Sequence, residues 1–173
     1  MNALGMHGFT FGIRSLQAAW RKIVGPVVTM RMIAAGQIPQ KTHLGMNAIA
    51  SARPGDVIVI DNGGRMDSSC WGGILADATK VRGVAATVIC TARGRVIEES
   101  ANQMIQCGGV QVRPGDIIFG DSSGIVCVPQ EKMLEILETA EQLWQKEEDM
   151  IAEIKAGADI LAVDAKYNYN KML

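Results

Sequence analysis

Residues 52–64 read ARPGDVIVIDNGG and residues 112–124 read VRPGDIIFGDSSG, and this internal repeat is the strongest indication of the fold. In each copy Pro-Gly-Asp predicts a turn, the apolar run after it predicts a strand, and an Asp followed by small residues ends that strand. Both apolar runs are continuous, so we expect strands buried on two faces. Two related units favour one sheet system in a single domain, although turns of this kind are common before strands and the match could arise by chance.

The segments around the first copy predict a strand, helix, strand order. Residues 23–33 predict a strand broken at Gly25-Pro26, and residues 41–50 are a weaker helix candidate. After the repeat, Asp67 and Ser68 can cap a helix that runs to residue 81, and residues 84–89 predict the next buried strand. The predicted buried face of that helix comprises Trp71, Ile74, Leu75, Ala78 and Val81. This order implies a parallel crossover connection.

The C-terminal part of the chain predicts one long amphipathic helix. It is expected to run over residues 130–156, opened by Pro129 and stopped by Gly157. The helix is longer than one small domain needs, so we expect its excess to pack on another subunit; a protruding solvated end is the alternative.

Composition indicates a globular protein of 173 residues with 48% hydrophobic residues, 20% charged residues and a net charge of −1. That charge favours neither a nucleic acid nor a membrane partner, and no apolar run is long enough for a membrane span. The N-terminus lacks the pattern of a signal peptide. The four cysteines (Cys70, Cys90, Cys107 and Cys127) form no C-x-x-C pair and are expected to be buried thiols of a cytoplasmic protein. A thiol nucleophile is the alternative.

A glycine-rich connection at residues 61–73 is the strongest candidate for a binding site. A buried strand ends there and a helix begins, with Gly72 and Gly73 in its first turn. Backbone N–H groups at a helix start can hold a carboxylate or a phosphate, and glycine allows a ligand to approach the backbone closely. The alternative is a tight connection that needs small residues for packing, and the pattern alone leaves the two interpretations even.

Other motifs give weaker indications. The glycine spacing does not fit a dinucleotide fingerprint, and the chain has neither a Walker loop nor a nucleophile elbow. His7 and His43 are far apart in the sequence, and the Arg93-Gly94-Arg95 cluster is more typical of a solvated loop. The carboxylates that could meet at strand ends are those of Asp61, Asp67, Asp77 and Asp121. Oxygen ligands of this kind would suit Mg²⁺ or Mn²⁺, whereas Asp after a strand more often forms a turn.

Taken in order, several stretches resemble the family that groups the regulator of ribonuclease activity A with the 4-hydroxy-4-methyl-2-oxoglutarate aldolases. These stretches are ARPGDVIVIDNGG, SSCWGGILADATKVRGVAATVI, IQCGGVQVRPGDIIFGDSSGIVCVP, the long helix and AKYNYNKML. The resemblance covers nearly the whole chain. It implies an α/β fold of the swivelling β/β/α type, one domain over residues 1–173, assembled as homotrimers or homohexamers.

The resemblance also implies a lyase that depends on a divalent metal, Mg²⁺ or Mn²⁺. Such enzymes cleave 4-hydroxy-4-methyl-2-oxoglutarate or a related keto acid to pyruvate and also act as oxaloacetate decarboxylases, in both cases through an enolate. By the resemblance, Gly72, Gly73, Ile74 and Leu75 would bind the keto-acid substrate through their backbone. Asp67, Glu98 and Glu99 would be outer-shell candidates near the metal.

One departure from the family pattern bears on catalysis. In the family, the strand that matches residues 84–89 continues into Asp-Gly-x-x-Arg-Asp, where Arg binds substrate and Asp binds the metal. Here it is followed by CTARGR, which resembles a later family segment, so roughly thirty residues would be absent between Ile89 and Thr91. An N-terminal helix of the family would also be missing. The alternative function is therefore a non-catalytic oligomeric binding protein that regulates a ribonuclease.

Overall fold

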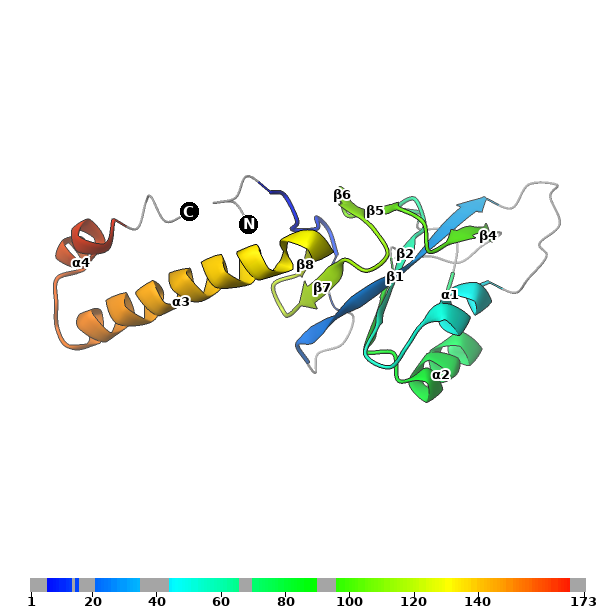
Figure 1. The fold of residues 1–173 in the computed structure, drawn as a ribbon, viewed down its shortest axis with the longest axis horizontal. Helices are drawn as coiled ribbons and strands as arrows, with labels where there is room; N and C mark the ends of the chain where they lie inside the picture. The colour runs from blue at the N-terminus through cyan, green and yellow to red at the C-terminus, as the bar shows by residue number, and fades with distance from the viewer. Residues whose placement is uncertain are drawn as a thin grey trace. The chain divides into compact units, whose positions relative to one another are not determined.

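The computed structural model describes residues 6–13, 15, 21–34, 44–65, 70–89 and 96–168. The chain divides into two compact units. The first, here called the sheet unit, comprises Gly8–Gln130, and the second, the helical unit, combines Met1–His7 with Glu131–Leu173. Figure 1 shows the elements of both units along the chain.

The sheet unit is built on a six-stranded sheet with the strand order β3-β2-β1-β7-β8, in which β4 also pairs with β1. The strands are β1 (Ile23–Ala34), β2 (Val57–Asp61), β3 (Ala86–Ile89), β4 (Val96–Ala101), β7 (Ile117–Gly120) and β8 (Ile125–Val128). A separate hairpin joins β5 (Ile105–Cys107) to β6 (Val110–Val112), and the helices are α1 (Met46–Ser51) and α2 (Gly73–Arg82). The predicted α/β class is confirmed, and the parallel pairing of β2 with β3 across α2 confirms the predicted crossover.

Strand β1 is continuous, so the expected break at Gly25-Pro26 is wrong. Instead the strand changes partner there: Ile23 to Pro26 pair with antiparallel β7, and Val27 onward pairs with parallel β2. Proline suits this point because it has no N–H group to donate across the sheet. Glycine at position 25 is required by a close approach, because a Cβ atom there would lie 2.2 Å from the carbonyl oxygen of Gly55.

The two RPGD turns adopt the same hydrogen-bonding arrangement. In the first, the Asp56 carboxylate accepts the backbone N–H of Arg53 at 2.8 Å, and Gly55 has a φ of 90°. In the second, the Asp116 carboxylate accepts the N–H of Arg113 at 2.8 Å, and Gly115 has a φ of 86°. The internal repeat in the sequence is therefore also a repeat in the structure.

Strand β2 separates two hydrophobic clusters, as the continuous apolar run predicts. Val57 and Val59 face a cluster that includes the β5–β6 hairpin, while Ile58 and Ile60 face a cluster with α1 and α2. Figure 1 shows the two helices together beside the sheet. All five residues of β2 are buried, because both of its faces are covered.

The second repeat and the edge strand are less buried than expected. In β7, Ile118 is buried whereas Phe119 is 43% exposed, so only one face of this strand is covered. In β3, which lies at the edge of the sheet, Val88 alone is buried. The continuous apolar runs therefore predicted more burial than the strands outside the centre of the sheet have.

Helix α2 begins later than predicted. Its N-cap is Gly72, so the expected cap at Asp67 and Ser68 is wrong, and those two residues lie outside the described part of the chain. Leu75 is buried on the predicted face, but Ile74 is 78% exposed and Val81 89% exposed. Helix α1 likewise starts at Met46 rather than near residue 41.

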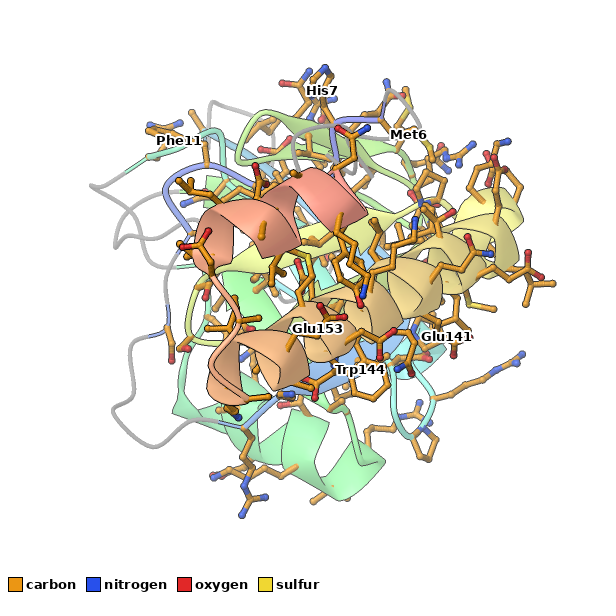
Figure 2. The ribbon with its side chains drawn as sticks, turned by 90° about the vertical axis from the view of Figure 1, so that its left-hand side faces the viewer. Met6, His7, Phe11, Glu141, Trp144 and Glu153 are labelled. Atoms are coloured by element: carbon orange, nitrogen blue, oxygen red, sulfur yellow. The ribbon has the colours of Figure 1, made fainter. Side chains whose placement is uncertain are left out.

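The helical unit confirms the predicted long helix. A short 3-10 helix (η2, Gln130–Lys132) leads into α3 (Met133–Lys155), and Gly157 follows the helix end with a φ of 94°. Helix α4 (Ile160–Tyr167) packs on α3 through buried Val163 and through Glu153, whose carboxylate accepts hydrogen bonds from Tyr167 and Lys166. Figure 2 shows Glu141, Trp144 and Glu153 along α3. No helix within the described residues is both long enough and apolar enough to span a bilayer.

Candidate functional site

A cavity of about 260 Å³ lies at the start of α2, in the sheet unit. It is lined by all four residues expected to bind substrate, Gly72, Gly73, Ile74 and Leu75, together with Leu44, Cys70 and Trp71. Leu44 was not expected at this site, because nothing in the local sequence links it to residues nearly thirty positions later. The structure thus brings the predicted backbone donors together at one hollow in the surface.

The helix start at this cavity presents backbone donors without a side-chain cap. The first hydrogen bond within α2 runs from the N–H of Ala76 to the carbonyl oxygen of Gly72, at 3.0 Å. The N–H groups of Gly73, Ile74 and Leu75 precede it, and Gly72 offers no side chain to accept them. The first turn of α2 also contains no acidic residue, so the positive end of the helix dipole is not neutralised from within the helix.

Packing does not explain the two glycines. A Cβ atom built on Gly72 or Gly73 would meet no atom of the described structure within 4 Å. Gly72 is extended, with a φ of −128°, a conformation that any residue adopts. Neither steric crowding nor backbone conformation therefore requires glycine here, which favours the interpretation in which these positions leave room for a ligand.

Glu98, a predicted outer-shell residue, holds the loop beside the cavity. Its carboxylate accepts the backbone N–H of Gly45 and the side-chain amide of Asn47, each at 2.8 Å. Gly45 in turn abuts the cavity wall, because a Cβ atom at this position would lie 3.0 Å from the ring of Trp71. Glu98 therefore positions the start of α1 against a cavity-lining residue.

Glu99 lies in a different cluster, together with Asp61 and Arg31. The guanidinium Nε of Arg31 lies 3.5 Å from the carboxylate of Glu99 and 3.6 Å from that of Asp61. Asp61 also accepts the backbone N–H groups of Gly63 at 2.9 Å and Gln106 at 3.3 Å. Asp61, the last residue of β2, thus holds the backbone at Gly63 and Gln106 in place. Its partner Arg31 was not expected from the sequence.

The remaining candidates are dispersed. Asp77 forms an exposed ion pair with Lys80 at 3.1 Å, and Asp121 accepts the N–H of Ser123 at 2.7 Å, as a turn-forming Asp does. Asp67, Arg93 and Arg95 lie outside the described residues, as does His43.

The residues that the structure describes do not fit a metal site. They contain no group of three or more His, Cys, Asp or Glu side chains placed to hold a metal ion. The carboxylates of Asp61 and Glu99 share the cation Arg31. We therefore derive no chemical step through a metal from these residues.

Cys127 is not a nucleophile at neutral pH. Burial, reinforced by the nearby Asp116 carboxylate, raises the pKa of its thiol to about 12. The thiol therefore stays protonated, and the thiolate needed for attack does not form. Cys70 and Cys107 are also buried thiols, as the sequence predicted; Cys90 lies outside the described residues.

Two proteins with similar sequences cover most of this chain, and this chain covers only part of each of them. Protein DlpA of Legionella pneumophila is 24% identical over 195 positions, which include 99% of this chain; the chain spans about a third (32%) of DlpA. The alignment with DlpA is 22 positions longer than the 173 residues of this chain. At least 22 aligned positions are therefore gaps in this chain. A Halalkalibacterium halodurans protein named "Putative 4-hydroxy-4-methyl-2-oxoglutarate aldolase" is 28% identical, over 83% of this chain and 76% of its own length.

Solved structures share the fold. An uncharacterized protein from Pseudomonas syringae pv. tomato matches with a TM-score of 0.82 and 26% identity, over 96% of this chain and 85% of its own. RraAS2 of Streptomyces coelicolor, described as an unusual member of the RNase ES inhibitor RraA protein family, matches with a TM-score of 0.72 and 24% identity, over 85% of each chain.

The family model described as RraA-like, Aldolase/RraA, matches this chain in two segments, residues 1–93 and 90–127. The two matched segments overlap at residues 90–93, beside the point between Ile89 and Thr91 where roughly thirty residues are expected to be absent. Together they cover more than half of the chain. The chain therefore belongs to the RraA-like family.

Proposed function

We propose that the cavity at the start of α2 binds the carboxylate of a small 2-keto acid, and that this chain acts as a keto-acid-binding member of its family. One observation carries the proposal: three uncapped N–H groups, those of Gly73, Ile74 and Leu75, lie where α2 borders a cavity of about 260 Å³. A cavity of this size lies just below the range of about 300–1,000 Å³ that is usual for small-molecule sites.

Different residues around the cavity contact different parts of the proposed ligand. The N–H groups at the start of α2 donate to the carboxylate, and the helix dipole favours its negative charge. Leu44 and Trp71 form an apolar wall against the carbon chain of the ligand and exclude water from it. Glu98 acts indirectly, because its hydrogen bond to Gly45 fixes the loop next to Trp71.

A second candidate function is the lyase itself, of the aldolase or oxaloacetate decarboxylase type. The similarity to the named aldolase from H. halodurans supports it. Its Mg²⁺ or Mn²⁺ would act as a Lewis acid on the keto group. The ligands for that ion would have to include groups beyond the described residues of one chain, such as Asp67 or a neighbouring copy in a homotrimer or homohexamer.

A regulatory role is the non-enzymatic alternative. RraAS2 is described as a member of a family of ribonuclease inhibitors, and this chain shares its fold. The shared fold is the support for a ribonuclease partner. A contact-based regulator would need neither the cavity nor a metal, and so it leaves the free helix start unexplained.

Two measurements on the same purified protein test these functions. Titration calorimetry with pyruvate, in the presence of a chelator, should show saturable binding that a ketone without the carboxylate, such as acetone, does not give. Pyruvate release from oxaloacetate should not exceed the rate with Mg²⁺ or Mn²⁺ alone. Release well above that rate would establish the lyase, whereas the absence of both binding and release would favour the regulator.

A further inference from the structure

The cavity at the start of α2 has room for a larger ligand than pyruvate. Its volume is about 260 Å³, which at about 30 Å³ per molecule of liquid water corresponds to about nine water-sized groups. Pyruvate has fewer non-hydrogen atoms than that, so it fills only part of the space. The rest is available to a longer chain on the keto carbon, and the chemistry of the walls decides which chain the cavity favours.

The walls beyond the helix start are apolar. Seven of the described residues line the cavity, and none of these seven carries a charged side chain. Cys70 and Leu75 belong to the hydrophobic cluster that contains α1 and α2, and Leu44 and Trp71 pack against the same cluster. The wall of the cavity is therefore an extension of the apolar core.

Ile74 continues this wall into the solvent. Its side chain lines the cavity and is nevertheless 78% exposed, although the next residue, Leu75, is buried. Packing against an aliphatic ligand would remove part of this apolar surface from water, which is favourable. Val81 on the same helix is 89% exposed but is not among the described residues that line the cavity. Ile74 is therefore an exposed apolar side chain in position to cover a ligand.

The charge beside the wall disfavours a second carboxylate on the ligand. The Glu98 carboxylate accepts the backbone N–H of Gly45 at 2.8 Å, and Gly45 directly follows Leu44 in the chain. A second carboxylate in the cavity would lie near this anion and against apolar side chains, and both contacts cost free energy. An aliphatic chain in the same place incurs neither cost.

We infer that the site prefers a 2-keto monocarboxylic acid with a short aliphatic chain to a dicarboxylic keto acid of the same size. The inference rests on the proposed function, because it takes the carboxylate at the start of α2 as given, and it adds the substrate class. The aliphatic chain packs on Leu44, Trp71 and the side chain of Ile74. The keto acids that the resemblance implies, 4-hydroxy-4-methyl-2-oxoglutarate and oxaloacetate, each carry two carboxylates, so this preference departs from them.

Titration calorimetry with a matched pair of ligands, in the presence of a chelator, tests the preference. The pair is 4-methyl-2-oxopentanoate and oxaloacetate, which have the same number of non-hydrogen atoms and differ in that an isopropyl group replaces the second carboxylate. Pyruvate is the reference ligand. We expect 4-methyl-2-oxopentanoate to bind more tightly than pyruvate, by about fourfold for each methylene group that becomes buried. Oxaloacetate should bind no more tightly than pyruvate.

The variant Ile74→Ala tests whether the aliphatic chain lies on this wall. It keeps the backbone N–H group and shortens a side chain that is 78% exposed, so the fold should be retained. We expect it to weaken binding of 4-methyl-2-oxopentanoate more than binding of pyruvate, and so to lower the ratio of the two affinities. Val81→Ala, the matched control at an exposed apolar position of the same helix, should leave that ratio unchanged.

The outcomes distinguish failure of the inference from failure of the proposed function. If oxaloacetate binds more tightly than 4-methyl-2-oxopentanoate, or if the latter binds no more tightly than pyruvate, the preference is refuted while the carboxylate site stands. An affinity ratio that Ile74→Ala leaves unchanged refutes the preference in the same way. If none of the three acids shows saturable binding, the proposed function itself is wrong, and the inference falls with it.

Discussion

Replacement of Gly73 by Pro tests the proposed anion site by removing a single donor. Proline is favoured at the first position of a helix, where its missing N–H has no partner within the helix. Gly73 is that position in α2, and the extended conformation of Gly72 suits a residue that precedes proline. A Cβ atom at position 73 meets nothing within 4 Å, so the first atom of the new side chain fits in the described structure.

The expected magnitudes separate folding from binding. Because proline restricts the unfolded chain, Gly73→Pro should leave the free energy of unfolding unchanged or raise it by up to about 1 kcal/mol. A hydrogen bond to a charged group contributes about 1.5–3 kcal/mol, so loss of the Gly73 N–H should raise the dissociation constant for pyruvate about tenfold to a hundredfold.

Gly73→Ala is the matched control, because alanine adds a Cβ atom at the same place but keeps the N–H group. Urea denaturation gives the stability of each variant, and titration calorimetry gives pyruvate affinity. Equal affinity of the proline and alanine variants would refute the assignment of this N–H to the ligand. If alanine alone abolished binding, the space beside Gly73, rather than its donor, would be what the ligand uses.

Three further predictions concern stability. Gly25→Ala should lower the free energy of unfolding by about 1–3 kcal/mol in urea titrations, because its Cβ would lie 2.2 Å from the Gly55 carbonyl oxygen. The raised pKa of Cys127 means that the folded state disfavours the thiolate. The protonated thiol therefore contributes fully to the free energy of unfolding below about pH 9, and this contribution is lost as the pH rises toward 12. In thermal melts over that pH range, the Cys127→Ser variant should lose less stability than the wild type. Glu98→Ala should remove about 1–2 kcal/mol and speed hydrogen exchange at the Gly45 N–H, and exchange unchanged from wild type would contradict its capping role.

Regularities that are local in sequence were predictable. The repeated RPGD turns, the crossover from β2 to β3 and the long C-terminal helix each follow from a pattern within about thirty residues. The cavity was predictable in part, because the glycine-rich connection placed a helix start near Gly72 and Gly73, although the side-chain cap expected before them was wrong. In each case one physical rule, turn chemistry or periodicity, acts without competition from distant contacts.

Features that depend on distant partners were not predictable. Glu98 is 53 positions from Gly45, and no local signal joins a carboxylate on β4 to the start of α1. The continuity of β1 depends on two different neighbours, β7 and β2, which are known only once the sheet is assembled. The exposure of Phe119 depends on how far the covering elements extend, whereas the sequence shows only that its strand is apolar.

In the fold, the proposed binding site is separate from the segment that the resemblance leads us to expect after β3. The cavity depends on the connection from β2 to α2, close to the centre of the sheet, whereas the segment expected from the resemblance would follow β3. Because β3 is the edge strand, a segment absent beyond it changes no hydrogen-bonded register between β3, β2 and β1. Only one residue of β3, Val88, is buried, so little of the described core depends on how the chain continues beyond this strand. We infer that the chain could fold without the segment expected to carry the Arg-Asp pair and still keep the proposed carboxylate site, so affinity for a keto acid, measured without metal, tests this protein more sharply than its turnover does.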